Sequence, residues 1–345
     1  MKKLKYKKKI CIFTTSRADY GLLRTFIKKI KQNKKIDSYV IATGSHLERK
    51  NNYTYKEIEQ DGIKIFSKIS LSIKNDNAKS ISKSIAIGLI SFNKTLEKVK
   101  PNLIVVLGDR FEILPICYSA LLLNIPIAHF NGGESTEGST DELIRHSVTK
   151  LSHLHFAANK VYANRIINMG ESPKRVFNVG GTSVDNIKSI KLLPQKNLEK
   201  FLNFKFKEKN FLITYHPATL NPIKSLKELK NLLKVLTKYK KYGLIFTGTN
   251  IDIKSNDIKK MINIFIKKNK NSIFIESMGS TRYISSMKLC DIIIGNSSSG
   301  ILEAPYFKKP VVNIGDRQKG RLKAKNIISC DGSYKSIDNS IKKAE

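Results

Sequence analysis

Residues suited to acid–base chemistry are concentrated in one segment, HFNGGESTEGSTDELIRHS, which covers residues 129–147. It contains four carboxylates after a Gly-Gly pair that allows a tight turn: Glu134, Glu137, Asp141 and Glu142. Neighbouring carboxylates shift one another's pKa, so that one acts as an acid while another stays a base. The segment therefore indicates proton transfer. Two structural interpretations stay open, a helix capping box between Ser139 and Glu142 and a helix-surface ion pair between Asp141 and Arg145.

A second candidate lies in the segment LGDRFE, where Asp109 and Arg110 directly follow the apolar run Leu103–Leu107. A doubly wound sheet binds its ligands at the carboxyl ends of its strands. We therefore expect Asp109 to lie opposite the carboxylate-rich segment and to take part in proton transfer. A local ion pair between Asp109 and Arg110 is the alternative.

Two further segments fit an anion. In TTSRADYGLL, Ser16 can cap a helix and Arg17 stands at its start, and free amides with an arginine there attract phosphate. In GNSSSGILEAP, the hydroxyls of Ser297 and Ser298 and the following amides could cradle a diphosphate, with Glu303 accepting hydrogen bonds from a ribose. Simple helix capping explains either segment taken alone.

The positions of the arginines add to this interpretation. The chain has 53 lysines and only ten arginines, and a planar guanidinium binds phosphate or carboxylate in a way that an ammonium cannot. Five arginines lie in or beside the polar segments: Arg17, Arg110, Arg145, Arg317 and Arg321. His216, in TYHPATL, follows another apolar run and is either a ligand-binding or a structural residue. The histidines near residues 129–155 give no metal site that we would predict.

The composition narrows the class of protein. A net charge of +35 suits anionic small substrates, but the lysines are spread over most of the surface and form no stripe interleaved with aromatic residues. We therefore expect no nucleic-acid partner. No apolar run approaches the roughly 18 residues of a membrane span, and the basic N-terminus lacks a signal-type apolar core. Four widely spaced cysteines predict neither zinc nor disulfides. We expect a cytoplasmic enzyme.

Apolar β-branched runs alternate with helical stretches along the whole chain. Examples are strands near Ile10–Thr14 and Leu103–Leu107 and helices near Ala78–Lys98 and Ser225–Tyr239. This alternation is typical of parallel sheets covered on both faces. The polar stretch 193–210 interrupts it. We predict an α/β protein with two Rossmann-like, doubly wound domains, residues 1–192 and 211–345, joined by a linker at 193–210 and facing each other across a central cleft.

Taken together, these segments resemble the hydrolysing UDP-N-acetylglucosamine 2-epimerases of bacterial sialic and legionaminic acid synthesis. The matching segments occur in family order from residue 10 to about 330: SRADYGLL, TGSHL, LGDRFE, HFNGGE, DELIRHSVTKLSHLHF, YHPATL, GNSSSGILEAP and NIGDRQKGR. The resemblance implies a GT-B fold, with sugar and proton-transfer loops in the first domain and UDP binding in the second. It also implies a homodimer, with no redox cofactor, obligatory metal or membrane partner.

The resemblance also implies the chemistry. A base removes the C2 proton of the sugar, UDP leaves C1 to give a 2-acetamidoglucal, and water adds to release N-acetylmannosamine. By position, Asp109, Glu134 and Asp141 resemble the proton-transfer carboxylates. The positions that resemble UDP-binding residues are Arg17, His216, Asn250, Ser297, Ser298, Glu303 and Arg317. Arg110 and His46 would lie beside them. Asn131 stands where some relatives carry Glu or His, which leaves open which group transfers the proton.

Several alternatives remain at this level. The same chemistry on UDP-2,4-diacetamido-2,4,6-trideoxyglucose, of the legionaminic acid pathway, is close to the UDP-N-acetylglucosamine interpretation, which we favour slightly. A non-hydrolysing epimerase fits the segments around Glu134 and Arg317 less well. A GT-B glycosyltransferase would not need the carboxylate-rich segment. A non-enzymatic polyanion binder would rely on the +35 charge alone and would lose its affinity in salt.

Overall fold

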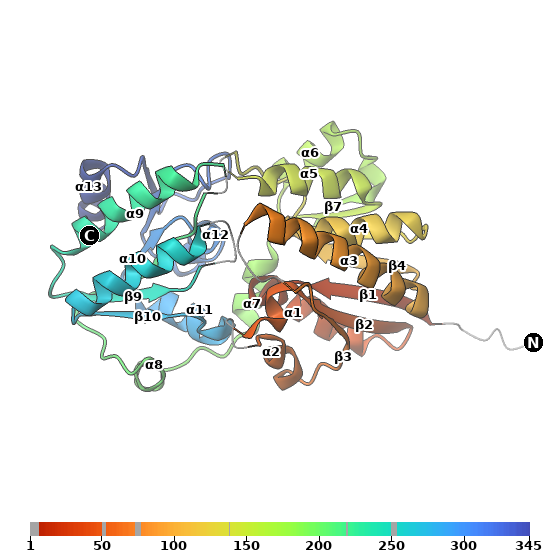
Figure 1. Ribbon diagram of the computed structural model, residues 1–345, viewed down its shortest axis with the longest axis horizontal. Helices are drawn as coiled ribbons and strands as arrows, with labels where there is room; N and C mark the ends of the chain where they lie inside the picture. Colours follow the sequence, from red (N-terminus) through yellow and green to blue (C-terminus); the bar gives the residue numbers. More distant parts are fainter. Residues whose placement is uncertain (1–6, 50–52, 73–76, 138, 219, 250–253) are drawn as a thin grey trace, which may run out of the picture. The chain divides into compact units, whose positions relative to one another are not determined.

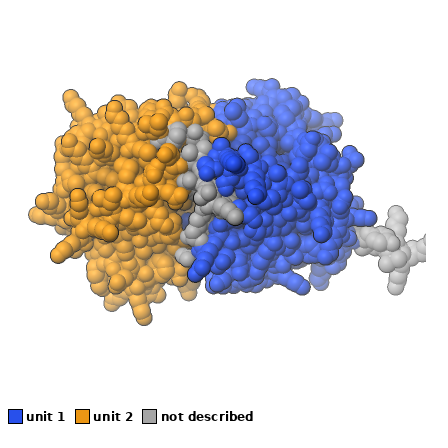
Figure 2. Space-filling model, in the orientation of Figure 1, with its two compact units in different colours: residues 1–134, 141–189 blue, residues 135–140, 190–345 orange. Residues whose placement is uncertain are grey.

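A computed structural model describes residues 7–49, 53–72, 77–137, 139–218, 220–249 and 254–345. The chain divides into two compact units (Figure 2): residues 1–134 with 141–189, and residues 135–140 with 190–345. The stretch 193–210, expected to be a linker, lies in the second unit and contains helix α8 (Gln195–Leu202). The inclusion of residues 135–140 in the second unit is a feature that the sequence pattern did not suggest.

The first unit is built on one sheet of seven parallel strands in the order β3-β2-β1-β4-β5-β6-β7 (Figure 1). Its strands are β1 (Lys8–Thr14), β2 (Ile36–Thr43), β3 (Ile65–Ile69), β4 (Leu103–Leu107), β5 (Ile127–Phe130), β6 (Leu154–Ala157) and β7 (Val176–Asn178). The strand order reverses direction between β1 and β4. At such a switch point the loops that follow the strands diverge and leave room for a ligand.

Helices cover both faces of this sheet because side chains alternate along each strand. On β1, Ile12 packs with Leu23 of the first helix, whereas Phe13 makes an edge-to-face contact with Phe92 at 5.8 Å between ring centroids. The helices are α1 (Arg17–Gln32), α2 (Tyr55–Gln60), α3 (Ala78–Val99), α4 (Ile113–Leu122), α5 (Asp141–Leu151), α6 (Lys160–Asn168) and α7 (Thr182–Ser189). Short 3₁₀ turns are η1 (Gly44–Leu47) and η3 (Pro173–Arg175).

The second unit repeats the plan with six parallel strands in the order β10-β9-β8-β11-β12-β13. They are β8 (Asn210–Thr214), β9 (Gly243–Thr247), β10 (Ser272–Ile275), β11 (Ile292–Gly295), β12 (Val311–Ile314) and β13 (Ile327–Cys330). Besides α8, its helices are α9 (Pro222–Leu236), α10 (Ser255–Lys268), α11 (Gly279–Leu289), α12 (Ser298–Leu302), α13 (Tyr334–Ala344) and the 3₁₀ turn η4 (Ala304–Phe307). Its switch point lies between β8 and β11. Each unit is thus Rossmann-like, as predicted.

Within the described residues, no helix is long and apolar enough to cross a membrane. In the same part of the chain, no group of three or more His, Cys, Asp and Glu side chains is arranged to hold a metal ion. The four cysteines are buried and unpaired.

Candidate functional site

The three carboxylates predicted to transfer protons all interact electrostatically with one buried arginine in the first unit. The Arg145 side chain is 1% exposed and forms an ion pair with Asp109, which follows β4. Its Nη1 also donates a hydrogen bond to the backbone carbonyl of Glu134 at 2.8 Å. Burial alone would lower the pKa of Arg145, but the charges of Asp109, Glu134 and Asp141 outweigh it and raise that pKa. We call these four residues the Arg145 cluster.

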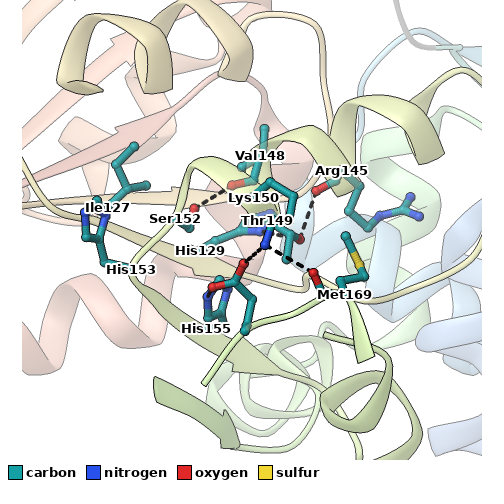
Figure 3. A network of polar contacts seen from close by, with 11 residues as sticks. Ile127, His129, Arg145, Val148, Thr149, Lys150, Ser152, His153, His155 and Met169 are labelled. Carbon is teal, nitrogen blue, oxygen red and sulfur yellow. Dashed lines mark hydrogen bonds and ion pairs between the residues drawn. The ribbon is translucent and has the colours of Figure 1, made fainter. Parts of the chain in front are cut away.

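Helix α5 positions one side of this cluster. Asp141, Arg145 and Thr149 are four residues apart, so they follow one another on a single face of the helix. Figure 3 shows Arg145 and Thr149 on this helix, close to His129. The helix-surface interpretation is therefore wrong for Arg145, because that side chain is almost fully buried. Glu142 pairs with His146 at 3.5 Å.

The turn after β5 positions the other side. Asn131 has φ +60°, a left-handed conformation that Asn tolerates better than most residues, and Gly133 has φ +75°. A Cβ on Gly133 would lie 2.3 Å from the carbonyl oxygen of Tyr162, so the turn requires glycine there. Arg165 Nη1 donates to the Gly133 carbonyl at 2.6 Å. Glu134 follows with 2% of its surface exposed.

Glu137, the other carboxylate of this segment, belongs to the second unit. Its backbone N–H donates to the Lys319 carbonyl at 3.0 Å, and its carboxylate pairs with the Lys319 ammonium at 2.9 Å. Glu137 is therefore engaged in an ion pair within the second unit.

Arg110 lies among buried carboxylates that the sequence analysis did not single out. Its Nε donates to Glu112 at 3.2 Å, and Glu112 is 0% exposed. Burial raises the pKa of Glu112 and that of Asp19, and the Arg110 charge opposes both shifts. Asp19 also accepts a hydrogen bond from the Thr15 backbone N–H at 3.2 Å. The sequence feature that could have identified Asp19 and Glu112 is their location in segments that follow the neighbouring strands β1 and β4.

Arg17 and His46 lie near the start of α1. Ser16 caps this helix by accepting a hydrogen bond from the Asp19 N–H at 3.2 Å, and Arg17 is its first, half-buried residue. His46 is fully buried, with Nε2 2.9 Å from the Thr14 hydroxyl and Nδ1 2.9 Å from the Thr54 hydroxyl. Burial, with a smaller effect of Arg17, lowers the pKa of His46 to about 3. Its direct contact with a substrate stays a prediction.

In the second unit, a pair of hydrogen bonds crosses the switch point between β8 and β11. The Asn296 side chain accepts from the His216 N–H at 2.7 Å and donates to the His216 carbonyl at 2.8 Å. The Asn296 carbonyl in turn accepts from Arg317 Nη1 at 3.1 Å and Gln318 Nε2 at 3.0 Å. His216 and Arg317 are therefore brought together around Asn296, and Asn296 and Gln318 were absent from the predicted set.

The serines after β11 form a chain of hydroxyl groups. Ser297 caps α12, its Oγ accepting from the Ser299 N–H at 3.4 Å, so the capping interpretation holds for this residue. The Ser299 hydroxyl contacts that of Ser297 at 3.0 Å and that of Tyr283. Ser298 is half-buried in the first turn, and Glu303, also half-buried, follows the last residue of α12. Asn250 lies outside the described residues.

Comparison with known proteins gives the family. A model of the UDP-N-acetylglucosamine 2-epimerase family matches residues 28–345. The chain is 43% identical to the GDP/UDP-N,N'-diacetylbacillosamine 2-epimerase (hydrolyzing) of Campylobacter jejuni, over 98% of this chain and 88% of that protein. It is 35% identical to the polysialic acid biosynthesis protein P7 of Escherichia coli, over 93% of this chain and 82% of that protein. It is 33% identical to the UDP-N,N'-diacetylbacillosamine 2-epimerase (hydrolyzing) of Legionella pneumophila, over 98% of this chain and 89% of that protein.

Solved structures agree in fold. The UDP-GlcNAc 2-epimerase of Neisseria meningitidis bound to UDP-GlcNAc matches with a TM-score of 0.79 at 19% identity, over 97% of this chain and 91% of that one. That of Methanocaldococcus jannaschii, in complex with UDP-GlcNAc and UDP, matches with a TM-score of 0.81 at 22% identity, over 97% and 92%. The predicted two-unit, Rossmann-like α/β fold is confirmed. The chain belongs to the UDP-N-acetylglucosamine 2-epimerase family, and it is an enzyme of the hydrolysing 2-epimerase kind.

Proposed function

We propose that the protein converts a UDP-linked 2-acetamido sugar into the free 2-epimer and UDP. A carboxylate of the Arg145 cluster removes the C2 proton while UDP leaves C1, which gives a 2-acetamidoglucal. Water then adds across the double bond from the face that inverts C2. The observation that carries the proposal is the convergence of Asp109, Glu134 and Asp141 on one buried arginine.

Physical chemistry favours this assignment. The C2 proton is weakly acidic, so its removal needs a base held in a fixed position. Arg145 holds Asp109 through an ion pair and the Glu134 backbone through a hydrogen bond, which fixes both relative to α5. An additional proton donor must serve the second step, and Asp141, one turn before Arg145, is our candidate. Asp109, Glu134 and Asp141 are thus proposed as the catalytic carboxylates.

The second unit supplies the groups proposed for UDP. Negative charge grows on the departing diphosphate, and positioned N–H, hydroxyl and guanidinium groups stabilise it. Arg317, His216 and the serines at 297 and 298 follow the carboxyl ends of β8, β11 and β12, where doubly wound sheets bind ligands. Glu303 is proposed to accept from the ribose. Arg17 and Arg110 of the first unit are proposed as further contacts, with His46 beside them.

Two sugars are the first to test. On the sequence segments we favour UDP-N-acetylglucosamine slightly. The relatives at 43% and 33% identity are named for N,N'-diacetylbacillosamine, which is the 2,4-diacetamido-2,4,6-trideoxyglucose considered above. The relative at 35% is named for polysialic acid biosynthesis. We propose that the enzyme serves the synthesis of a sialic or legionaminic acid type of sugar in the cytoplasm.

The test is incubation of the purified protein with each UDP-sugar separately, followed by proton NMR. Release of a free manno-configured sugar together with UDP supports the proposal, and the ratio of kcat/KM values identifies the substrate. An intact UDP-sugar epimer would indicate a non-hydrolysing enzyme. Turnover that requires an added acceptor alcohol would indicate a glycosyltransferase. Either result would overturn the proposal.

We also propose that the protein forms a homodimer through the first unit. Helix α3 packs against α4, and α4 against α5. These three helices carry large apolar side chains with high exposure: Ile90 73%, Tyr118 49%, Leu121 44%, Leu122 57% and Leu143 69%. We call this set the α3–α5 apolar surface. Exposed apolar groups that gather on neighbouring helices are typical of interfaces.

A further inference from the structure

His129 is a buried side chain that the proposed chemistry does not use. It lies on β5 with 0% exposure, and Figure 3 shows it close to Thr149 of helix α5. Its Nε2 is 2.8 Å from the carbonyl oxygen of Gly108, and its Nδ1 is 3.4 Å from the hydroxyl of Thr149. A Cβ on Gly132 would lie 3.0 Å from Nδ1, so the absence of a side chain at residue 132 leaves room for the His129 ring in this position. The ring is therefore held closely at both nitrogens.

The contact with Gly108 fixes the tautomer. A carbonyl oxygen only accepts, so Nε2 must carry the proton and donate. Burial lowers the pKa of His129 to about 4, and the Gly108 bond offsets only part of that effect. The ring is therefore neutral near pH 7, with a hydrogen on Nε2 and a lone pair on Nδ1.

The hydrogen bond from His129 helps to hold Gly108, the residue that precedes Asp109. Gly108 has φ +80° and donates its N–H to the Phe130 carbonyl at 3.0 Å. Its carbonyl accepts from His129. Both polar backbone groups of Gly108 are thus bound to β5, one by the backbone of the strand and one by a side chain. The direction in which the chain leaves β4, and hence the location of Asp109, depends on this pair of bonds.

The other edge of the ring contacts the helix that carries the partner of Asp109. The Thr149 hydroxyl has one hydrogen, which it can donate either to the Arg145 carbonyl at 3.0 Å or to the lone pair of His129 Nδ1 at 3.4 Å. Arg145 binds the Asp109 carboxylate. His129 therefore contacts Gly108, the residue before Asp109, and Thr149, one helical turn after Arg145. Asp109 and Arg145 are the two members of one ion pair, so His129 contacts the chain next to each of them.

We propose that His129 is a positioning residue for the reaction: its neutral Nε2–H fixes the Gly108 carbonyl and thereby sets the location of Asp109 against Arg145. This inference rests on the proposed function of Asp109. A shift of about 1 Å in a reacting group costs roughly 100-fold in rate. Loss of the Nε2 donor should therefore lower kcat while KM changes little.

The chain offers a matched control in His155. It pairs with His129 in the register of β5 and β6, and it is also 0% exposed. Its Nε2 instead contacts Glu171 at 3.3 Å, and Glu171 pairs with Lys150. His155 thus bonds to Glu171, whereas His129 bonds to Gly108. Substitution of His155 therefore disturbs a buried histidine of the same sheet without removing the proposed function of His129.

The experiment compares His129→Asn, His129→Gln and His155→Asn. Asn reaches only as far as Nδ1, whereas Gln places an amide N–H near Nε2 and can restore the bond to Gly108. We expect His129→Asn to lower kcat roughly 10- to 100-fold with KM within about 3-fold. His129→Gln should recover most of this loss, and His155→Asn should retain kcat within about 3-fold. Equal kcat losses in His129→Asn and His129→Gln, or in His129→Asn and His155→Asn, would overturn the proposal.

A measurement on the wild-type protein separates this inference from the proposed function and holds even if His129→Asn fails to fold. Long-range proton–nitrogen NMR of ¹⁵N-histidine protein, assigned with His129→Gln, reports the tautomer of each ring. We expect His129 as the neutral Nε2–H form from pH 6 to 8. An Nδ1–H form or a charged ring would overturn the inference, whatever the enzyme's substrate. Absence of turnover by the wild type on either sugar would overturn the proposed function instead.

Discussion

At the scale of single residues, the Arg145 cluster shows which part of the chemistry a sequence can reveal. Asp109, Glu134 and Asp141 could be selected because carboxylates at strand ends and helix starts are suited to proton transfer. The function of Arg145 as their common partner could not be selected, because an i,i+4 Asp–Arg spacing is equally typical of a solvated helix face. Its burial, which decides between the two, depends on the packing of α5 against β5 and α4.

Neutralising each of the three carboxylates that we propose as catalytic should abolish turnover but leave UDP binding largely intact. We expect Asp109→Asn, Glu134→Gln and Asp141→Asn to lower kcat by roughly 100-fold or more, since general acid–base groups contribute about 100- to 10,000-fold. The dissociation constant of UDP, measured by calorimetry, should change less than about 3-fold. Rates close to wild type in all three variants would show that the acid–base assignment is wrong.

Arg317→Ala should give the opposite pattern, a direct loss of UDP affinity. A charge-assisted hydrogen bond is worth about 1.5–3 kcal/mol, so we expect the dissociation constant to rise roughly 10- to 100-fold. Gln318→Leu is the matched control, because Gln318 is also buried and also donates to the Asn296 carbonyl but carries no charge. Equal losses in the two variants would assign the effect to Asn296 rather than to the guanidinium.

His46 should make stability depend on pH in a defined direction. Its folded-state pKa of about 3 lies below the ordinary 6.5, so below pH 6.5 the unfolded chain binds a proton that the folded protein does not. Stability from this group is therefore present above pH 6.5 and lost as the pH falls, by about 1.4 kcal/mol per pH unit. Urea unfolding should show the wild-type free energy falling by about 2 kcal/mol relative to His46→Gln between pH 7 and pH 5. A free energy that falls equally in the wild type and in His46→Gln would contradict this expectation.

At the scale of elements, the central strands could be predicted and the edge strand β3 could not. The apolar runs of β1, β4, β8 and β11 are central strands covered on both faces, so their sequences are nearly continuous in apolar residues. Strand β3 is an edge strand with alternate residues exposed, and its pattern, IFSKI, was not singled out. Residues 298–307 form α12 and the 3₁₀ turn η4 rather than one continuous helix, because Pro305 has no N–H to donate to the preceding turn.

The turn after β5 should tolerate no side chain at Gly133. In Gly133→Ala the new Cβ would approach the Tyr162 carbonyl oxygen to 2.3 Å at φ +75°, so the turn must shift. Gly62→Ala is the matched control: it has φ +71°, and no described atom lies within 4 Å of its Cβ. We expect Gly62→Ala to cost about 1 kcal/mol of unfolding free energy and Gly133→Ala at least about 2 kcal/mol more. Equal costs would mean that backbone conformation alone, and not the close approach, requires glycine at 133.

At the scale of the whole molecule, the presence of two units was predictable, but the assignment of residues 135–140 to the second unit was not. Each unit has its own sheet and core, and the rhythm of strands and helices indicates both. Residues 135–140 join the second unit because the Glu137 backbone and side chain both bond to Lys319. Such a contact between residues 182 positions apart leaves no periodic signal in the sequence.

The proposed homodimer gives a prediction at this scale. Sedimentation equilibrium of the wild type should give twice the chain mass of 39.1 kDa. Leu122→Glu, on the α3–α5 apolar surface, should shift the protein towards the monomer because a charge in an apolar interface loses its hydration. Ile223→Glu, at a 76% exposed position of α9 in the second unit, should leave the mass unchanged. A monomeric wild type, or a dimer unaffected by Leu122→Glu, would contradict the proposed interface.

The most direct test of the proposed chemistry is the reaction in deuterium oxide, followed by proton NMR of the sugar. If a carboxylate of the Arg145 cluster removes the C2 proton before water adds, the released manno-configured sugar carries deuterium at C2 in every molecule. The Asp109→Asn variant should release neither UDP nor deuterated sugar at a comparable rate. A released sugar that retains its original hydrogen at C2 would contradict proton abstraction, and with it the function proposed for the three carboxylates.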